Sequence, residues 1–233
     1  MIKLILKYYK DLFRLRFNKD GNTKFSRIIY KYINKGIYLD IGCYHPVKES
    51  HTAYLYNRGW NGYNIDIDQN TIKLFNIFRK KDTNINLGLS HKNGTHYAYF
   101  EKNISAVSSL DKNYHSKIGR TTVFKKKIKA VTLGKLRRNL RLKKINFLTI
   151  DCEGMDEKII LKSKLKDLEA DFLCIEVLPQ TIFGWRNFNF PPGNIDKFCI
   201  KYFLKSSIYR KLKKIYTIKS NEEYTFLLKL KWP

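Results

Sequence analysis

The sequence contains no run of about 18 or more uncharged apolar residues, which excludes a membrane-spanning helix on sequence grounds. Residues 1–17 carry charges too closely spaced for the apolar core of a signal peptide, so we expect a cytoplasmic protein. Cysteine is scarce as well. The four cysteines lie far apart, without a CxxC pair or a histidine at metal-site spacing, and this pattern predicts buried, reduced thiols.

Acidic residues are also few: 46 Lys and Arg stand against 20 Asp and Glu, which gives a formal net charge of +26. Residues 112–150 contain thirteen Lys or Arg and no acid. Such a run is either a solvated face that reflects a compositional bias or the contact surface for an anionic partner. The partners that would fit are a nucleic acid, a phosphate-bearing substrate and an anionic membrane.

The N-terminal segment predicts a basic amphipathic helix over residues 1–17, with apolar and basic side chains at helical spacing on opposite sides. Such a helix packs onto the protein's own core or lies peripherally on an anionic membrane, here the inner membrane face. A second helix is predicted over residues 24–34, ending before Gly36. We therefore divide the chain into a helical extension, residues 1–35, and a main domain, residues 36–233.

The main domain alternates between short apolar runs and helical patterns. Predicted strands are "GIYLDIG", "GYNIDID", "TNINLGLS", "INFLTIDCEG" and "ADFLCIEVLP", and predicted helices cover residues 48–58, 70–79, 133–142 and 155–166. This alternation predicts an α/β fold, a doubly wound parallel sheet with helices on both faces. Two departures are expected: a hairpin at Asn93-Gly94, and consecutive antiparallel strands over 207–218 and 222–230 at the sheet edge.

The turn after the first strand, "LDIGCYHP", predicts a ligand site, because doubly wound sheets bind ligands at the carboxyl ends of their strands. Asp40 ends that strand, Gly42 permits a close approach of the backbone, and Asp66 ends the next strand, where an acid can accept both hydroxyls of a ribose. A GxGxxG phosphate cradle is missing, which points to an adenosine ligand without phosphates, S-adenosylmethionine. The predicted cofactor-binding residues are Asp40, Gly42, His45, Ser50, Thr52, Asp66 and Gly88.

Five ordered motifs resemble the FkbM-type S-adenosylmethionine-dependent methyltransferases: "LDIGCYHPVKESHTAYLYNRGWNGYNIDID", "NLGLSHKNGT", "VTLGKL", "INFLTIDCEGMDEKIILKS" and "FLCIEV". The resemblance covers residues 37 to about 178. It implies a class I methyltransferase (Rossmann-like) sheet of about seven strands with an antiparallel last strand. It further implies O-methylation, often of sugar hydroxyls.

Asp151 and Glu153 are the predicted catalytic centre. A sugar hydroxyl is a poor nucleophile, so methyl transfer needs a base or a metal close by. Because alternate residues of a strand share a face, both carboxylates point toward the site if the strand extends that far. They act as base and orienting group or as ligands of a divalent metal such as Mg²⁺; the alternative for Glu153 is to cap the next helix. Glu176, His45 and His51 are further candidates, and residues 181–194 suit a loop over the acceptor pocket.

The sequence thus predicts an S-adenosylmethionine-dependent O-methyltransferase that acts on a sugar hydroxyl of a glycan, or of its nucleotide- or lipid-linked precursor. The basic surface suits a phosphate-bearing small-molecule or glycan acceptor, or peripheral contact with an anionic membrane. The alternative is an RNA-binding protein or RNA methyltransferase. Against that alternative, the chain contains no recognisable RNA-binding module.

Overall fold

The computed structural model describes residues 23–177 and 194–232. The predicted helix over residues 1–17 and the predicted acceptor loop up to residue 193 lie outside the described residues. The division at residue 35 is not tested by the fold and stays a prediction. Residues of the helix that precedes it do pack on the domain: Phe25 and Ile29, on α2 (Thr23–Tyr32), are fully buried.

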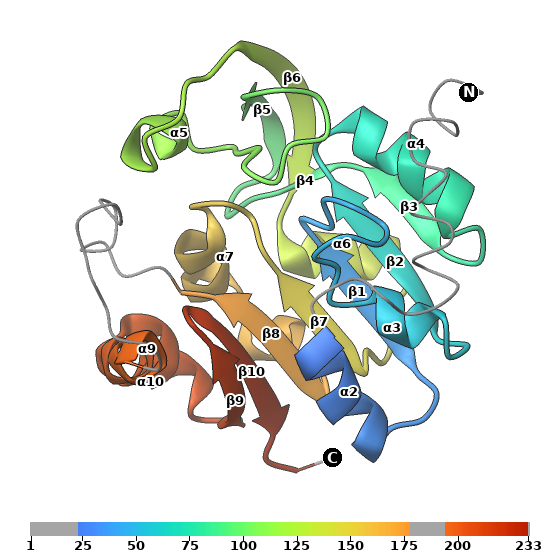
Figure 1. Ribbon diagram of the computed structural model, residues 1–233, viewed down its shortest axis with the longest axis vertical. Helices are drawn as coiled ribbons and strands as arrows, with labels where there is room; N and C mark the ends of the chain where they lie inside the picture. The colour runs from blue at the N-terminus through green and yellow to red at the C-terminus, as the bar shows by residue number, and fades with distance from the viewer. Residues whose placement is uncertain (1–22, 178–193, 233) are drawn as a thin grey trace.

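The centre of the protein is a seven-stranded sheet in the order β3-β2-β1-β7-β8-β10-β9 (Figure 1). The first five strands of this order are parallel, whereas β10 is antiparallel to both β8 and β9. This arrangement confirms the predicted Rossmann-like methyltransferase fold and its antiparallel end. The strands are β1 (Ile37–Ile41), β2 (Asn61–Asp66), β3 (Thr83–Asn86), β7 (Phe147–Ile150), β8 (Phe172–Glu176), β9 (Tyr216–Glu222) and β10 (Thr225–Leu230).

The central strands are apolar on both sides because helices cover both faces of the sheet (Figure 1). Tyr38 and Leu39 point to opposite faces of β1 and belong to two different core clusters. One face packs on α2 and α3 (Ala53–Tyr56), with α4 (Gln69–Phe78) beside them. The other packs on α6 (Leu133–Asn139), α7 (Asp156–Lys162), α8 (Leu165–Leu168), α9 (Asn194–Lys205) and α10 (Ser207–Leu212).

A second sheet, β4-β6-β5, lies beyond the carboxyl end of the parallel strands (Figure 1). It consists of β4 (Gly88–Leu89), β5 (Gly94–Phe100) and β6 (Phe124–Val131), and α5 (Tyr114–Lys117) lies between β5 and β6 in the chain. The hairpin predicted at Asn93-Gly94 is therefore wrong, because β6 separates the two strands that this turn joins. The predicted strand over 83–90 likewise divides into β3 and β4, which belong to different sheets.

Three other predicted elements differ from the structure. The helix expected over 48–58 is only the single turn of α3, because side-chain hydrogen bonds hold residues 45–52 as a loop. The helix over 155–166 divides into α7 and α8, separated by extended backbone at Ser163 and Lys164. The strand predicted over 207–218 begins as α10, where the Ser206 hydroxyl accepts a hydrogen bond from Tyr209 N, and only β9 is extended.

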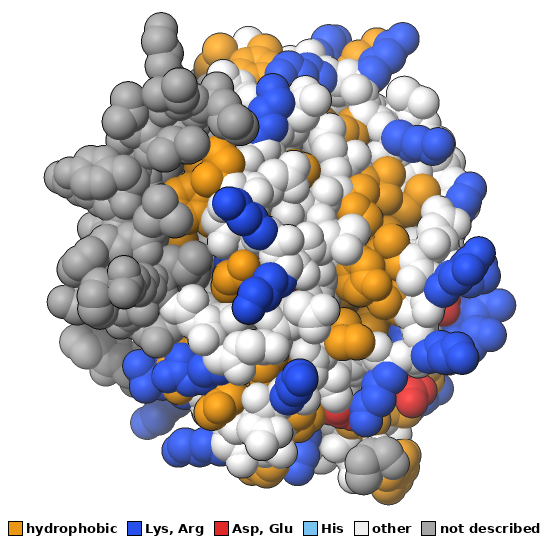
Figure 2. Space-filling view, turned by 90° about the vertical axis from the view of Figure 1, so that its right-hand side faces the viewer, with side chains coloured by type: hydrophobic (Ala, Val, Ile, Leu, Met, Phe, Trp, Pro, Cys, Tyr) orange, Lys and Arg blue, Asp and Glu red, His pale blue; other side chains and the backbone are white. Residues whose placement is uncertain are grey.

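Basic side chains dominate the surface. In Figure 2, lysine and arginine side chains surround a hydrophobic strip on one face of the protein, and acidic side chains are few there. Within the described ranges, no helix is long and apolar enough to cross a membrane.

Candidate active site

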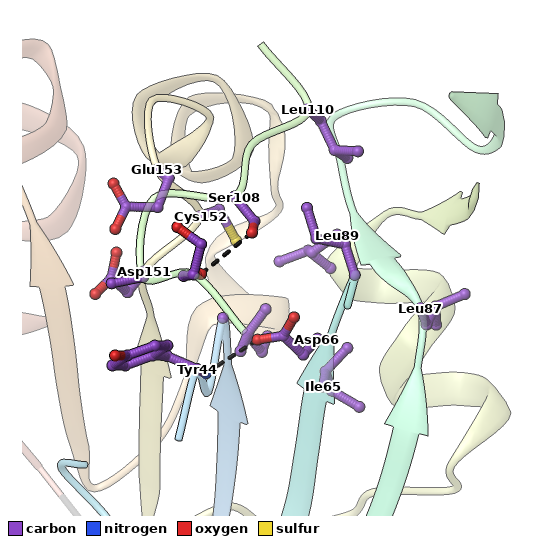
Figure 3. A pocket seen from close by; sticks show the side chains of 15 residues that line it. Tyr44, Ile65, Asp66, Leu87, Leu89, Ser108, Leu110, Asp151, Cys152 and Glu153 are labelled. Carbon is purple, nitrogen blue, oxygen red and sulfur yellow. Dashed lines mark hydrogen bonds between the residues drawn. The ribbon is translucent and has the colours of Figure 1, made fainter. Parts of the chain in front are cut away.

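A pocket lies at the carboxyl ends of β1, β2 and β7, against the segment 105–110 that follows β5 (Figure 3). It contains about 450 Å³ of empty space, part of it open to solvent. Its walls combine aliphatic side chains with a few acids. The lining residues are Ile41, Gly42, Tyr44, Ile65, Asp66, Ile67, Leu87, Leu89, Ser105, Ala106, Ser108, Leu110, Asp151, Cys152 and Glu153.

The turn after β1 forms one wall of this pocket. Gly42 has a φ of +76°, and its backbone N–H donates to the carbonyl of Ile65 at 2.9 Å. A Cβ at this position would lie 1.6 Å from the carbonyl oxygen of Asp151, so only glycine lets the turn pass so close to the end of β7. Tyr44 follows with a φ of +50°, and its N–H donates to the Asp66 carboxylate at 2.9 Å.

Asp66 ends β2 inside the pocket, as predicted from its place in the sequence. Its second carboxylate oxygen accepts the N–H of Asp68 at 2.7 Å. Burial raises the pKa of Asp66 to about 7, although both backbone hydrogen bonds favour the ionised form. Because a carboxylate offers about four acceptor positions, Asp66 can still accept hydroxyls of a ligand.

The other residues predicted to bind the cofactor lie near this turn but are not among those that line the pocket. Thr52 Oγ1 donates to Asp40 Oδ2 at 2.6 Å, and Ser50 Oγ accepts the N–H of Ala53 at 3.2 Å. His45 Nδ1 accepts the N–H groups of residues 47 and 48 at 3.1 and 3.0 Å. Gly88 is buried between the lining residues 87 and 89. Cofactor contact by Asp40, His45, Ser50, Thr52 and Gly88 therefore stays a prediction.

Arg79, which the sequence did not single out, anchors the same turn from behind. Its guanidinium is fully buried and donates to the carbonyl of Pro46 at 2.8 and 2.7 Å and to Ser50 Oγ at 3.1 Å. On its other side it donates to Tyr38 Oη at 3.2 Å and forms an ion pair with Asp82 at 3.7 Å. The partners lie 29 to 41 residues away along the chain, except for Asp82, so no local pattern could have indicated them.

Three acidic side chains meet beside the pocket. Asp151 follows β7, Glu176 ends β8, and Glu153 lies in the turn before α7; each offers one carboxylate oxygen, and these atoms lie within 4.8 Å of one another. The strand does not extend to Glu153, as a shared strand face for Asp151 and Glu153 would have required, since β7 ends at Ile150. Glu153 reaches the group instead through left-handed backbone, with a φ of +47°.

Two side chains from the segment between β5 and β6 hold Glu153 in place. The buried Tyr114 hydroxyl donates to Glu153 Oε2, and Ser109 Oγ donates to the Glu153 carbonyl at 2.6 Å. The Tyr114 ring also packs where a Cβ at Gly154 would lie, 2.5 Å from Cδ2. Neither residue was predicted as part of the site, because each lies about 40 residues before Glu153 in the chain.

The structure does not support a helix cap at Glu153. The N-cap of α7 is Met155, which makes no side-chain cap hydrogen bond, and Asp156 accepts the N–H of Cys152 at 2.7 Å. His51, another candidate base, stacks on Phe25 with ring centroids 5.8 Å apart. Burial lowers the pKa of His51 to about 4, which makes it a weak base.

Burial dominates the electrostatics of the three acids. It raises the pKa of Glu153 to about 8, against the effect of the Tyr114 hydrogen bond, and raises the pKa values of Asp151 and Glu176 well above their ordinary range. The neighbouring carboxylates add repulsion to Asp151 and Glu176. Among the described residues, buried Asp151 Oδ1 and Glu176 Oε2 have no hydrogen-bond partner. A cluster of buried carboxylates of this kind favours protonation of its members or the binding of a cation.

The FkbM methyltransferase domain model matches residues 40–204, a span that includes the turn after β1, Asp66 and all three acids. The chain belongs to the FkbM methyltransferase family. No curated protein matches the sequence. Membership makes this FkbM protein a methyltransferase and implies S-adenosylmethionine as its methyl donor.

The chemistry of the lining residues suits that donor. An adenosine group needs apolar walls for the base and acceptors for the ribose hydroxyls. The acid at the end of β2 offers such acceptors, and Ile65, Ile67, Leu87, Leu89 and Leu110 offer such walls. The cradle at Gly42, which is closed to any side chain, brings bare backbone to the pocket.

Proposed function

We propose that this FkbM protein transfers a methyl group from S-adenosylmethionine to a sugar hydroxyl of a glycan, or of its nucleotide- or lipid-linked precursor. The observation that supports O-methylation most directly is the acidic group formed by Asp151, Glu153 and Glu176, which adjoins the predicted donor pocket. A hydroxyl must lose its proton as its oxygen is methylated, so the reaction needs a base at this point.

The cofactor is proposed to place its ribose on Asp66 and its base among the aliphatic side chains of Ile65, Ile67, Leu87, Leu89 and Leu110. When bound, it supplies a methyl group on a positively charged sulfur. The turn at Gly42 and Tyr44 would position the donor next to the end of β7, and Asp151 and Glu153 line the same pocket. Alignment of this kind contributes a large part of catalysis in group-transfer enzymes.

Glu153 is the proposed base. It lines the pocket, and its pKa of about 8 places its proton affinity near neutral pH, where general bases work best. The Tyr114 hydroxyl fixes one carboxylate oxygen, which orients the other. The proton of the acceptor hydroxyl passes to Glu153, and Asp151 orients the acceptor.

The alternative to a base at Glu153 is a divalent cation such as Mg²⁺, which we propose would bind at the same three carboxylates. Three oxygen ligands within 4.8 Å of one another, two buried oxygens without a partner, and the mutual repulsion of the acids support it. Carboxylates are preferred ligands of Mg²⁺. A bound cation would lower the pKa values of the acids and of a coordinated hydroxyl. If it binds, Mg²⁺ should raise the melting temperature of the wild type and have little effect on Glu176→Gln; an equal rise in both would exclude this site.

The acceptor is proposed to carry phosphate, as nucleotide- and lipid-linked sugars do. The support is electrostatic: a net charge of +26 attracts anionic substrates and raises their association rates. The sugar itself is not specified by the described residues.

The test is methyl transfer from radiolabelled S-adenosylmethionine to a panel of nucleotide sugars, by the wild type and three variants. Glu153→Gln and Asp151→Asn should each lower the turnover rate at least ~100-fold, in line with the usual contribution of a general base. Glu157→Gln, the same change on the exposed side of α7, is the matched control and should keep full activity. Full activity of Glu153→Gln would overturn its role as the base.

A further inference from the structure

The register of β5 and β6 places three lysines on one face of the second sheet. Opposite residues of an antiparallel pair share a face, and the pairs are Thr95 with Lys129, Tyr97 with Lys127, and Tyr99 with Lys125. All three lysines are exposed. We call this surface the lysine face; it consists of Thr95, Tyr97, Tyr99, Lys125, Lys127 and Lys129.

The opposite face of the same strands fixes this orientation. Ala98 and Ala130 are fully buried, and Phe100 is 2% exposed and stacks on Phe124 with ring centroids 5.0 Å apart. A slip of one residue would turn Ala98, Phe100 and Ala130 away from the core. The core therefore holds the three charges in a row on the outside, at the ~6.7 Å spacing of alternate strand residues.

These charges are not neutralised by acids. No ion pair in the described part of the chain involves the three lysines. Lys125 and Lys127 instead place their ammonium groups 4.9 and 6.0 Å from the centre of the Tyr97 ring. Neither β5 nor β6 contains an acidic residue. Like charges this close repel one another, so an anionic partner would be strongly favoured there.

The lysine face lies at the end of the molecule that carries the active site. The second sheet stands beyond the carboxyl ends of the parallel strands (Figure 1), and β5 runs directly into the segment 105–110 that lines the pocket. Tyr99 also forms an isolated antiparallel β-bridge with Ser109 of that segment. A surface bound here would therefore lie near the pocket.

We propose that the lysine face binds the headgroup phosphates of an anionic lipid bilayer. The competing partner, single-stranded nucleic acid, is usually bound through aromatic rings on which bases stack. Here the exposed ring, Tyr97, already contacts two ammonium groups. Lysine beside tyrosine suits a headgroup layer, where the charge meets phosphate and the ring lies at the interface. The exposed Val123, 69% accessible just before β6, adds an apolar contact.

The test is sedimentation of the full-length chain with vesicles of phosphatidylcholine mixed with phosphatidylglycerol, and with vesicles of phosphatidylcholine alone. The variant changes Lys125, Lys127 and Lys129 to Gln. Its control changes Lys201, Lys205 and Lys214 to Gln, three exposed lysines on or after α9 and α10, at the opposite end of Figure 1. Both variants lose the same net charge, and circular dichroism checks that each is folded.

We expect the wild type to bind only the anionic vesicles. The lysine-face variant should bind them about 100-fold more weakly, roughly fivefold per lysine, and the control variant nearly as well as the wild type. Equal loss in both variants would overturn the proposal in favour of a general charge effect. The other arm measures the binding of single-stranded RNA to the same proteins. If the lysine-face variant loses RNA binding but binds vesicles like the wild type, the face is assigned to nucleic acid instead. Neither readout depends on methyl transfer.

Discussion

Gly42 and Asp151 lie so close together that a Cβ on Gly42 would fall 1.6 Å from the Asp151 carbonyl oxygen. One residue belongs to the turn that holds the predicted cofactor, and the other begins the acidic group. The two halves of the proposed site are thus in backbone contact, and any displacement of the turn moves it relative to the acids.

Gly42→Ala should therefore be strongly destabilising. Left-handed backbone at alanine and overpacking against Asp151 together cost roughly 3 kcal/mol, or a melting temperature about 10 °C lower for a chain of this size. Gly59→Ala is the matched control, since Gly59 has a φ of +85° but nothing within 4 Å of the added Cβ. It should lower the melting temperature by only about 3 °C. An equal decrease in melting temperature for both variants would contradict the close contact between Gly42 and Asp151.

Arg79→Lys should weaken cofactor binding without direct contact to the cofactor. Lysine keeps the charge beside Asp82 but cannot hold both the Pro46 carbonyl and Ser50. We expect about tenfold weaker binding of S-adenosylhomocysteine in calorimetry, equivalent to ~1.4 kcal/mol.

Tyr38→Phe is the control for this change. The change removes the Tyr38 hydroxyl, to which the Arg79 guanidinium donates on the side of the sheet. It leaves the contacts of Arg79 to the turn in place. Both variants should be less stable, but only Arg79→Lys should bind more weakly. Unchanged affinity in Arg79→Lys would show that the arginine stabilises the fold without positioning the turn.

Cofactor affinity should depend on pH through Asp66. Burial raises the pKa of Asp66 to about 7, so the carboxylate that we propose as the acceptor of the ribose hydroxyls is lost as the pH falls through that value. Binding of S-adenosylhomocysteine should therefore strengthen as the pH rises from about 6 to about 8 and then level off, with at most tenfold change per pH unit. In Asp66→Asn the affinity should be weak and independent of pH. A flat profile in the wild type would argue against this role.

Tyr114→Phe should shift the pH dependence of methyl transfer. The Tyr114 hydroxyl donates to the Glu153 carboxylate and favours its ionised form, so its loss raises the pKa of Glu153 above about 8. The rising limb of the rate profile should move to higher pH. Tyr216→Phe removes a buried hydroxyl that contacts Leu168 and Ala170 far from the site. It should lower stability and leave the profile where it is.

Much of the main sheet could be predicted because its signals are local. The central strands β1, β7 and β8 are short, largely apolar runs, and the acids at the ends of the parallel strands meet at one edge because parallel strands end together. Asp66, Asp151 and Glu153 were found in this way, and all three line the pocket.

The second sheet was missed for a physical reason. The sequence "FKKKIKAV" of β6 is half lysine, and only its last two residues, Ala130 and Val131, are buried. Its partners β4 and β5 lie before it in the chain, on both sides of the Asn93-Gly94 turn, and this turn predicted that they form a hairpin. In the structure β6 pairs with both of them instead.

The supporting residues of the site left no pattern in the sequence. Arg79 follows an amphipathic helix, where a basic residue is ordinary, and Tyr114 lies in a polar segment. Their roles arise from contacts with Pro46 and Glu153 across large separations. Only the folded chain brings these groups together.

The central claim is that the pocket binds S-adenosylmethionine through Asp66. Isothermal titration of S-adenosylmethionine and S-adenosylhomocysteine into the wild type and Asp66→Ala, each with and without Mg²⁺, tests it most directly. We predict micromolar binding to the wild type that is lost in Asp66→Ala. Absence of binding to the wild type under every condition would contradict the account.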